Sequence, residues 1–198
     1  MCDCDIEKIL SERDALLIRE YGVALDFAGF DTRNSVLDVA TGSGRMLLQL
    51  LQRGCSVVSG DINSEALDKA RQRLGELADK PTLVIMDAHN LEFDNSSFQS
   101  VTFANAIHEI DSPRGALDEI ARVMTDDGKL LVIEFNSHGF DIMDHNHKLL
   151  GKEMHPRGEM TTEEIDSYLH FLFDDVKTRE SSITHAWIAS GKKQIKTL

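Results

Sequence analysis

Hydrophobic residues along this chain gather in short continuous runs that are separated by longer segments with helical spacing. The runs lie at residues 35–39, 56–60, 82–86, 100–104 and 129–135. Short apolar runs of this kind are typical of strands that are buried on both faces of a sheet. In the segments between them, apolar residues recur three or four positions apart, as on one face of a helix. This alternation predicts parallel strands joined by right-handed helical crossovers.

Polar residues at helix starts and the spacing of the last segments complete the predicted fold. The predicted helices are 11–27 with Ser11 as its cap, 46–51, 64–78, one from Pro113 with Ser112 as its cap, and one from the capping box Thr161-x-x-Glu164. Residues 175–181 and 184–190 are spaced for an antiparallel pair. A chain of 198 residues fits one domain. We therefore expect a single α/β domain over residues 1–198, with a doubly wound, seven-stranded, mostly parallel sheet and an antiparallel last strand.

Charge and composition narrow the classes of partner. The formal net charge is −13 and the sequence pI is about 4.9. A field of this sign repels nucleic-acid phosphates and anionic lipid heads, so we expect no nucleic-acid partner. Because no uninterrupted apolar run reaches about 18 residues, we also expect no membrane span. Three cysteines, a small and odd number, do not make a disulfide framework, and this favours a cytoplasmic protein.

The first candidate ligand-binding motif lies at the end of the first predicted strand, in the sequence Leu37-Asp-Val-Ala-Thr-Gly-Ser-Gly44. Gly42 and Gly44 let the backbone turn tightly and approach a ligand closely. The N–H groups of the following helix point at whatever lies in the turn. Asp61 ends the next strand, where a carboxylate can accept both hydroxyls of a ribose. Ligands of doubly wound sheets bind beyond the carboxyl ends of the strands, so this turn predicts a nucleotide-like ligand.

Two common nucleotide motifs are incomplete at this turn. The NAD fingerprint G-x-G-x-x-G requires a third glycine, and Leu47 occupies that position. The Walker A motif is absent, because no Gly-Lys-Ser/Thr follows the turn. Two acidic positions favour another ligand. Asp38 lies inside the end of the first strand, and Asp87, followed by Ala88, ends the third strand, where an acid can accept from an adenine amino group.

The order of these motifs resembles the class I S-adenosylmethionine-dependent methyltransferases, of the small single-domain type-11 kind. That family has an acid at the end of strand one, a Gly-rich turn, and acids that end strands two and three, matched here by Asp38, the Gly42–Gly44 turn, Asp61 and Asp87. Its fourth-strand motif is matched by residues 101–108. The segment that leads into its fifth strand, a helix followed by a Gly turn and an apolar strand, is matched by residues 122–132. The resemblance covers most of the chain. It implies a Rossmann-like fold and S-adenosylmethionine as the cofactor.

The resemblance also implies roles for individual residues. Asp38 and the Gly42–Gly44 turn hold the methionyl part, Asp61 binds the ribose hydroxyls, and Asn105 lines the sulfonium side. Ile62 lies against the adenine, and Asp87 and Ala88 contact its edge. The full implied set is Asp38, Ala40, Thr41, Gly42, Gly44, Asp61, Ile62, Asp87, Ala88 and Asn105. The chain departs from the family at Ala40, often Gly elsewhere, and at Arg45, which either clashes with the methionine carboxylate or pairs with it.

A catalytic residue is expected just beyond the fourth strand. Methyl transfer needs mainly alignment of the acceptor with the activated carbon. A general base is needed only where the acceptor is protonated. The candidates are His108, Glu109 and Asp111. We select His108, because a histidine titrates near neutral pH; the alternative is a histidine that only forms part of the pocket wall.

Two further segments are expected to shape the acceptor pocket. Residues 1–34 form an N-terminal helical cap, whose other possible roles are sheet cover and a homodimer contact. Residues 136–160 hold four of the eight histidines: His138, His145, His147 and His155. Their spacing matches no standard zinc pattern and no Cys lies nearby. We therefore expect a lid over the acceptor and no metal ligand.

The sequence thus predicts an S-adenosylmethionine-dependent methyltransferase that acts on a small-molecule acceptor, with a protein acceptor left open. A protein that binds S-adenosylmethionine without turnover, as a sensor or a partner subunit, is the alternative from a different class. A nicotinamide-dependent enzyme is a second alternative, which the missing third glycine disfavours.

Overall fold

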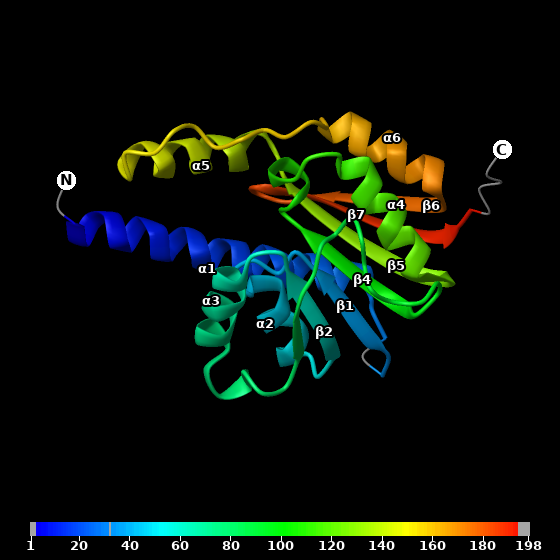
Figure 1. Cartoon of the computed structure of the whole chain (residues 1–198). Coiled ribbons are helices and arrows are strands. Elements are labelled where there is room, and N and C mark those ends of the chain that lie inside the picture. Colours follow the sequence, from blue (N-terminus) through cyan, green and yellow to red (C-terminus); the bar gives the residue numbers. More distant parts are fainter. Residues whose placement is uncertain (1–2, 32, 194–198) are drawn as a thin grey trace.

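The computed structural model describes residues 3–31 and 33–193, which form a seven-stranded sheet with the order β3-β2-β1-β4-β5-β7-β6 (Figure 1). The strands are β1 (Ser35–Val39), β2 (Ser56–Asp61), β3 (Thr82–Ile85), β4 (Phe98–Ala104), β5 (Met124–Phe135), β6 (Phe173–Glu180) and β7 (Thr184–Lys192). Strands β1 to β5 pair in parallel, and β7 pairs antiparallel with both β5 and β6. The predicted doubly wound sheet with its antiparallel last strand is confirmed.

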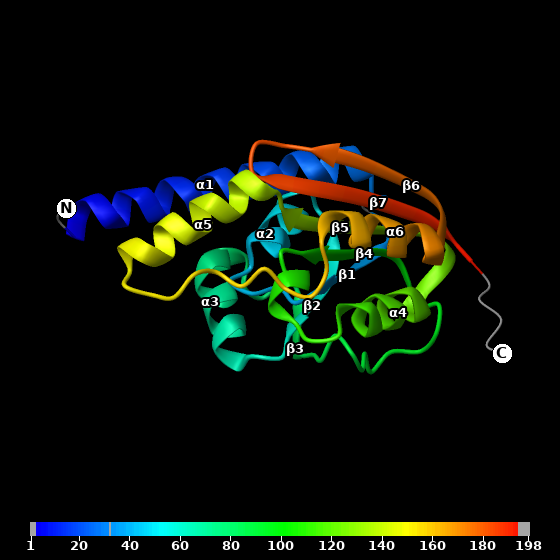
Figure 2. The same cartoon turned by 90° about the horizontal axis from the view of Figure 1, so that it is seen from above.

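Helices cover both faces of this sheet (Figures 1 and 2). The α-helices are α1 (Asp3–Ala28), α2 (Arg45–Gln52), α3 (Ser64–Leu74), α4 (Pro113–Val123), α5 (Ser137–Leu149) and α6 (Thr162–Leu172); the short 3₁₀ turns are η1 (Gly75–Leu77) and η2 (Ile107–Glu109). Helices α1, α2 and α3 pack on one face, and α4 and α6 on the other. Helix α5 lies beside α1 (Figure 2).

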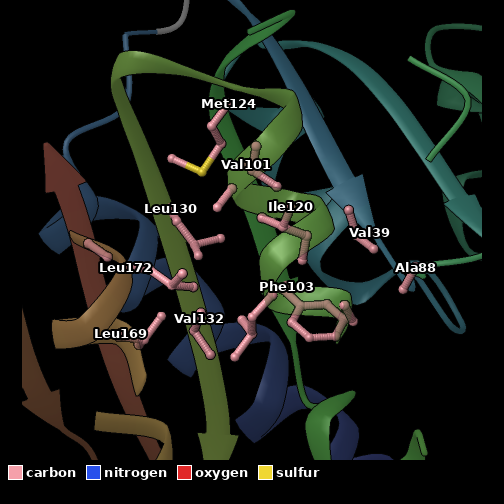
Figure 3. Close-up of a cluster of buried hydrophobic side chains, with 14 of the residues drawn as sticks. Val39, Ala88, Val101, Phe103, Ile120, Met124, Leu130, Val132, Leu169 and Leu172 are labelled. Carbon is pink, nitrogen blue, oxygen red and sulfur yellow. The ribbon is translucent and has the colours of Figure 1, made fainter. Parts of the chain in front are cut away.

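Alternate residues of each central strand face opposite layers, which creates two apolar cores. Leu37, Val101 and Val132 pack with α4 and α6, as Figure 3 shows for part of this cluster. Val36 and Leu131 face the opposite side and pack with α1 and α2. This period of two is the reason why the strands appear in the sequence as continuous apolar runs.

Helix starts were the least accurate part of the prediction. Ser11 lies inside α1 and does not cap it, since the helix begins at Asp3. Ser112 precedes α4 but has φ +50° and makes no side-chain capping hydrogen bond, although Pro113 does occupy the first turn. Helix α3 ends at Leu74 and continues only as the η1 turn. The capping box is confirmed, because Thr161 and Glu164 each accept from the other's backbone N–H.

The segment from 136 to 160 contains α5 and an extended stretch that returns to the strand ends. Asn136 caps α5 by accepting from the N–H of Gly139 at 2.9 Å. Phe140, Ile142 and Met143 pack against the same core as α1. Within the described ranges, no helix has the length and the apolar character that a membrane crossing requires.

Glu20 joins α1 to the turn between β6 and β7. Its buried carboxylate accepts from the N–H of Ile183 at 3.2 Å and from Oγ1 of Thr184 at 2.7 Å. Replacing Glu20 by alanine leaves two buried donors without this acceptor. We expect Glu20→Ala to lower the free energy of unfolding by about 2–4 kcal/mol in urea denaturation.

The matched control for this prediction is Glu7→Ala, because Glu7 is exposed on the same helix. It should leave the free energy of unfolding almost unchanged. Equal losses in the two variants would contradict the anchoring role of Glu20.

Candidate functional site

A cavity of about 430 Å³ lies at the carboxyl ends of β1, β2 and β4. Its lining includes nearly all of the residues implied by the sequence: Asp38, Ala40, Thr41, Gly42, Asp61, Ile62, Asp87, Ala88, Asn105 and His108. Gly44 does not line it. The parallel register carries these side chains to one edge, because strands that run in the same direction end on the same side of the sheet.

The glycine turn after β1 is held by the neighbouring strand. The N–H of Gly42 donates to Oδ2 of Asp61 at 2.8 Å, and the N–H of Thr41 donates to the carbonyl oxygen of Gly60 at 2.9 Å. The other oxygen of Asp61 accepts from the N–H of Asn63 at 2.9 Å. Gly42 has φ +54°, and a Cβ at this position would meet nothing within 4 Å in the described part of the chain. The turn therefore presents open backbone to the cavity.

Gly44 serves the packing of two helices. It precedes α2 with φ +77°, and a Cβ there would lie 2.9 Å from Cβ of Ala70 on α3. The structure thus separates two roles that the sequence motif could not distinguish: Gly42 faces the cavity, and Gly44 permits close contact between α2 and α3.

Asp38 is buried beneath the cavity and is hydrogen-bonded to both neighbouring strands. Its carboxylate accepts from Oγ of Ser59 at 2.8 Å and from Oγ1 of Thr102 at 2.7 Å. Burial raises the pKa of Asp38, and the neighbouring hydroxyls, that of Thr102 most, oppose this effect. The side chain therefore links β1 to β2 and β4 directly below the glycine turn.

The predicted adenine side of the cavity combines an acid with exposed apolar surface. Asp87 accepts from the N–H of His89 at 2.9 Å and contacts Nδ1 of the same residue at 3.0 Å. These hydrogen bonds lower the pKa of Asp87. Both contacts use Oδ1 of Asp87. Ile62 is 68% exposed at the rim, which is unusual for an isoleucine and leaves its side chain available to a flat apolar group.

Asn105 and Thr41 carry buried polar atoms that lack a hydrogen-bond partner within residues 3–31 and 33–193. The atoms are Oδ1 and Nδ2 of the Asn105 amide and Oγ1 of the Thr41 hydroxyl. Asn105 also has φ +51°, a left-handed conformation that asparagine adopts more readily than most residues. Buried polar groups are seldom left unpaired in folded proteins. Two such groups on the wall of one cavity indicate a ligand that supplies their partners.

His108 is buried in the wall of the cavity, on the η2 turn. Its Nδ1 contacts Oε1 of Glu134 at 2.6 Å, and its Nε2 lies 2.9 Å from Nε2 of His155. Burial alone would lower the pKa of His108, but the carboxylates of Glu109 and Glu134 outweigh it and raise this pKa to about 9. Burial and the neighbouring His108 lower the pKa of His155 to about 4. Both nitrogens of His108 are therefore engaged, which argues against a free general base.

Arg45 pairs with a carboxylate of α1. Its Nε donates to Oδ1 of Asp14 at 2.5 Å, and Arg73 reaches Oδ2 of the same residue at 2.6 Å. Arg73 also donates to the carbonyl oxygen of Ser43 at 2.7 Å. Burial would raise the pKa of Asp14, but the two arginines lower it overall. These contacts fasten α1 and α3 to the glycine turn.

Several residues of the cavity were not selected from the sequence. Glu134 is buried within β5 and holds His108, and it was visible as the single acid in the apolar run 129–135. Glu134 does not itself line the cavity, whereas Tyr21 and Arg13 of α1 and Met143 of α5 do. No local sequence signal marks these residues, because they reach the site only through the packing of α1 and α5 beside the sheet. Asp111, the remaining base candidate, does not line this cavity.

Known proteins that are similar to this chain are methyltransferases. Residues 37–132 match a family model described as a methyltransferase domain. A demethylmenaquinone methyltransferase of Clavibacter sepedonicus is 31% identical over 121 residues, which cover 61% of this chain and 49% of that protein. A ubiquinone/menaquinone biosynthesis C-methyltransferase UbiE of Pseudomonas savastanoi pv. phaseolicola is 29% identical over 167 residues, which cover 81% of this chain and 65% of that protein. The chain thus spans half to two thirds of the length of these relatives.

The fold is also found among solved structures. The crystal structure of a SAM dependent methyltransferase from Aquifex aeolicus superposes with a TM-score of 0.68 at 18% sequence identity. The superposition covers 93% of this chain and 97% of that one.

The two glycines of the turn should respond differently to substitution. Gly44→Ala combines a left-handed backbone with a steric overlap at Ala70, and we expect it to lower the free energy of unfolding by about 2–4 kcal/mol. Gly42→Ala meets open space and should lose only about 1–2 kcal/mol. Chemical denaturation of both variants measures this difference. A loss at Gly42 that equals or exceeds the loss at Gly44 would refute the assignment of Gly44 to helix packing.

Proposed function

We propose that this chain is a class I S-adenosylmethionine-dependent methyltransferase, and that it transfers a methyl group from S-adenosylmethionine to a small-molecule acceptor. The observation that carries the proposal is the unpaired polar lining of the cavity. The amide of Asn105 and the hydroxyl of Thr41 are buried without partners in the described structure, beside the open backbone at Gly42. A ligand with both hydrogen-bond donors and acceptors is needed to satisfy them.

The residues of the cavity suit the parts of such a cofactor. Asp61 offers a carboxylate whose oxygens each already accept one backbone N–H and retain lone pairs for ribose hydroxyls. Ile62 offers exposed apolar surface to the adenine base, and Asp87 and Ala88 also line the cavity. Thr41 and the turn at Gly42 would contact the amino-acid part, with Asp38 as their buried support. Asn105 would face the sulfonium side.

The cofactor supplies a methyl group that its positive sulfur already activates, so the work of the protein is alignment. Tyr21 of α1 and Met143 of α5 line the cavity and help to close it. Holding an acceptor there in line with the methyl group and excluding water can supply several kcal/mol of the barrier reduction, about 7–11 at best. Segment 136–160 includes Met143 and fits the role of a lid.

The acceptor is most simply a small molecule. The cavity is enclosed between α1, α5 and the strand ends, and the net charge of −13 opposes polyanionic acceptors. The names of the relatives refer to methylation in quinone biosynthesis. A carbon or oxygen acceptor on a small aromatic molecule is therefore the first class to test. His108 lines the same cavity, where it orients or contacts the acceptor.

Turnover separates this proposal from a protein that only binds the cofactor. Incubation of the protein with S-adenosylmethionine and a panel of quinols, phenols and thiols should yield S-adenosylhomocysteine and a methylated product, both measured by mass spectrometry. In a thermal-shift assay, S-adenosylmethionine should raise the melting temperature and NAD should not. Cofactor binding without turnover on any acceptor would favour the sensor, and stabilisation by NAD alone would overturn the assignment.

Asp61 provides a sharp test of cofactor binding. Asp61→Asn keeps the size of the side chain but removes its charge and one acceptor, so the ribose hydroxyls lose a charge-assisted hydrogen bond. We expect the affinity for S-adenosylhomocysteine, measured by calorimetry, to fall by about 10-fold or more. Asp68→Asn is the matched control, because Asp68 is an exposed carboxylate on α3. Unchanged affinity in Asp61→Asn would sink the proposed ribose contact.

A further inference from the structure

Two buried histidines from distant parts of the chain meet with their Nε2 atoms 2.9 Å apart. His108 lies on η2, and His155 lies in the extended stretch after α5. Their exposed fractions are 3% and 7%, so solvent does not separate them. Phe135 and Phe140 pack around the pair. Burial of two imidazoles among apolar rings requires a partner at the point where the two nitrogens converge: a shared proton or a cation.

The outer nitrogens of both rings are fixed by further groups. Nδ1 of His108 contacts the buried carboxylate of Glu134 at 2.6 Å, and Nδ1 of His155 lies 3.2 Å from Nε2 of His147. The other nitrogen of His147 contacts the carbonyl oxygen of Glu153 at 2.7 Å. Metal-binding histidines are characteristically held in this way, by a carboxylate or another acceptor on the nitrogen that faces away from the ion. The arrangement turns both Nε2 atoms toward one point.

Glu109 provides a third atom at this point. Its Oε1 lies 3.7 Å from Nε2 of His108 and 3.9 Å from Nε2 of His155, and the three ligand atoms lie within 4.8 Å of one another. Two metal–nitrogen bonds of about 2.1 Å span about 3.0 Å at a right angle and about 3.4 Å at the tetrahedral angle. The observed 2.9 Å between the nitrogens is close to the right-angle value. The side chain of Glu109 is exposed, so a small rotation brings its oxygen within bonding distance.

The backbone around His155 is built to hold it against His108. The N–H of His155 donates to Oδ1 of Asp144 on α5 at 3.0 Å. Gly158 has φ +73°, and a Cβ there would lie 2.5 Å from Cα of His108. Only a glycine lets the chain pass this close to η2. The meeting of the two histidines is therefore fixed by the packing of two segments.

We propose that His108, Glu109 and His155 form a binding site for one divalent transition-metal ion. Two imidazoles and one carboxylate favour ions such as Zn²⁺ or Fe²⁺ over Mg²⁺ and Ca²⁺, which prefer oxygen ligands alone. Three protein ligands leave coordination positions open. All three residues line the cavity at the strand ends, and they also line a second cavity that includes His147. An ion at this point thus faces the space assigned to the acceptor.

The role of the ion rests on the proposed function. An acceptor with an oxygen, nitrogen or sulfur donor would bind to an open position of the ion, within the cavity that the three ligands line. The ion would orient the donor atom and stabilise its ionised form. His108 would then act as a ligand of the ion, which agrees with the engagement of both its nitrogens.

The test measures metal binding directly on protein without an affinity tag. Elemental analysis of the purified protein, followed by chelation, dialysis and calorimetric titration with Zn²⁺ and Co²⁺ separately, should give about one ion per chain. The Co²⁺ form should show the visible absorption of a site with nitrogen and oxygen ligands. Absence of stoichiometric binding of both ions would overturn the site.

Variants identify the ligands. Glu109→Gln and His155→Ala should weaken Zn²⁺ binding by at least about 100-fold, and Glu134→Gln by about 10- to 100-fold through loss of the contact to His108. His145→Ala is the matched control, because His145 is exposed on α5 and outside both cavities that contain the cluster. It should bind Zn²⁺ like the unmodified protein. Glu109→Gln is the decisive variant even if His155→Ala misfolds, because an exposed side chain is not needed for folding.

Calorimetric binding of S-adenosylhomocysteine to the metal-free protein separates failure of this proposal from failure of the proposed function. Nucleoside binding without any Zn²⁺ or Co²⁺ binding would overturn the metal site alone. Metal binding that depends on Glu109 and His155, without nucleoside binding, would support the site and overturn the methyltransferase. Unchanged Zn²⁺ affinity in Glu109→Gln and His155→Ala would refute the assigned ligands.

Discussion

The hydrogen bond from the N–H of Gly42 to the carboxylate of Asp61, at 2.8 Å, fixes the turn after β1 to the end of β2. It depends on the parallel register of the two strands, in which Val39 lies opposite Gly60. A shift of one residue would turn Asp61 to the other face of the sheet. Because the turn also begins α2, the same bond sets the position of that helix and of the cavity wall. The metal site proposed at His108, Glu109 and His155 lines the same cavity and therefore depends on this arrangement of the strands and the turn.

The parallel strands and the acids at their ends could be predicted from the sequence because their signals are local. A buried parallel strand appears as an apolar run, and an acid at its end stands out from that run, as Asp61 and Asp87 do. Helix starts were harder to predict, because a serine with capping chemistry is not always used as a cap. Ser11 lies within α1, and the backbone at Ser112 turns into the left-handed region before Pro113. In each case tertiary packing outweighed the local preference.

The histidine cluster could not be predicted from spacing, because its members are not neighbours in the sequence. Residues 136–160 contain no standard zinc pattern, so the segment by itself predicts no metal ligand. The structure brings His155 to His108 across 47 positions, and it supplies Glu109 and Glu134 from the fourth and fifth strand ends. The one available signal was an acid within an otherwise apolar strand. A buried acid of this kind needs a partner, and here the partner is His108.

Two of the four non-glycine residues with positive φ in the described structure, Ala40 and Asn105, line the cavity. Ala40 and Asn105 follow β1 and β4 directly, and both have positive φ, at 56° and 51°. Each such conformation costs about 1–3 kcal/mol in a residue other than glycine, and neither position relieves it with a side-chain hydrogen bond, since Ala40 has no polar atoms and the Asn105 amide has no partner in the described structure. The strain directs the chain away from the strand ends and opens the cavity between them. Positive φ alone does not mark a ligand site, since Ser96 and Ser112 have it away from this cavity. At Asn105 it coincides with a buried amide that lacks a partner in the described structure, and a ligand in this space would supply that partner.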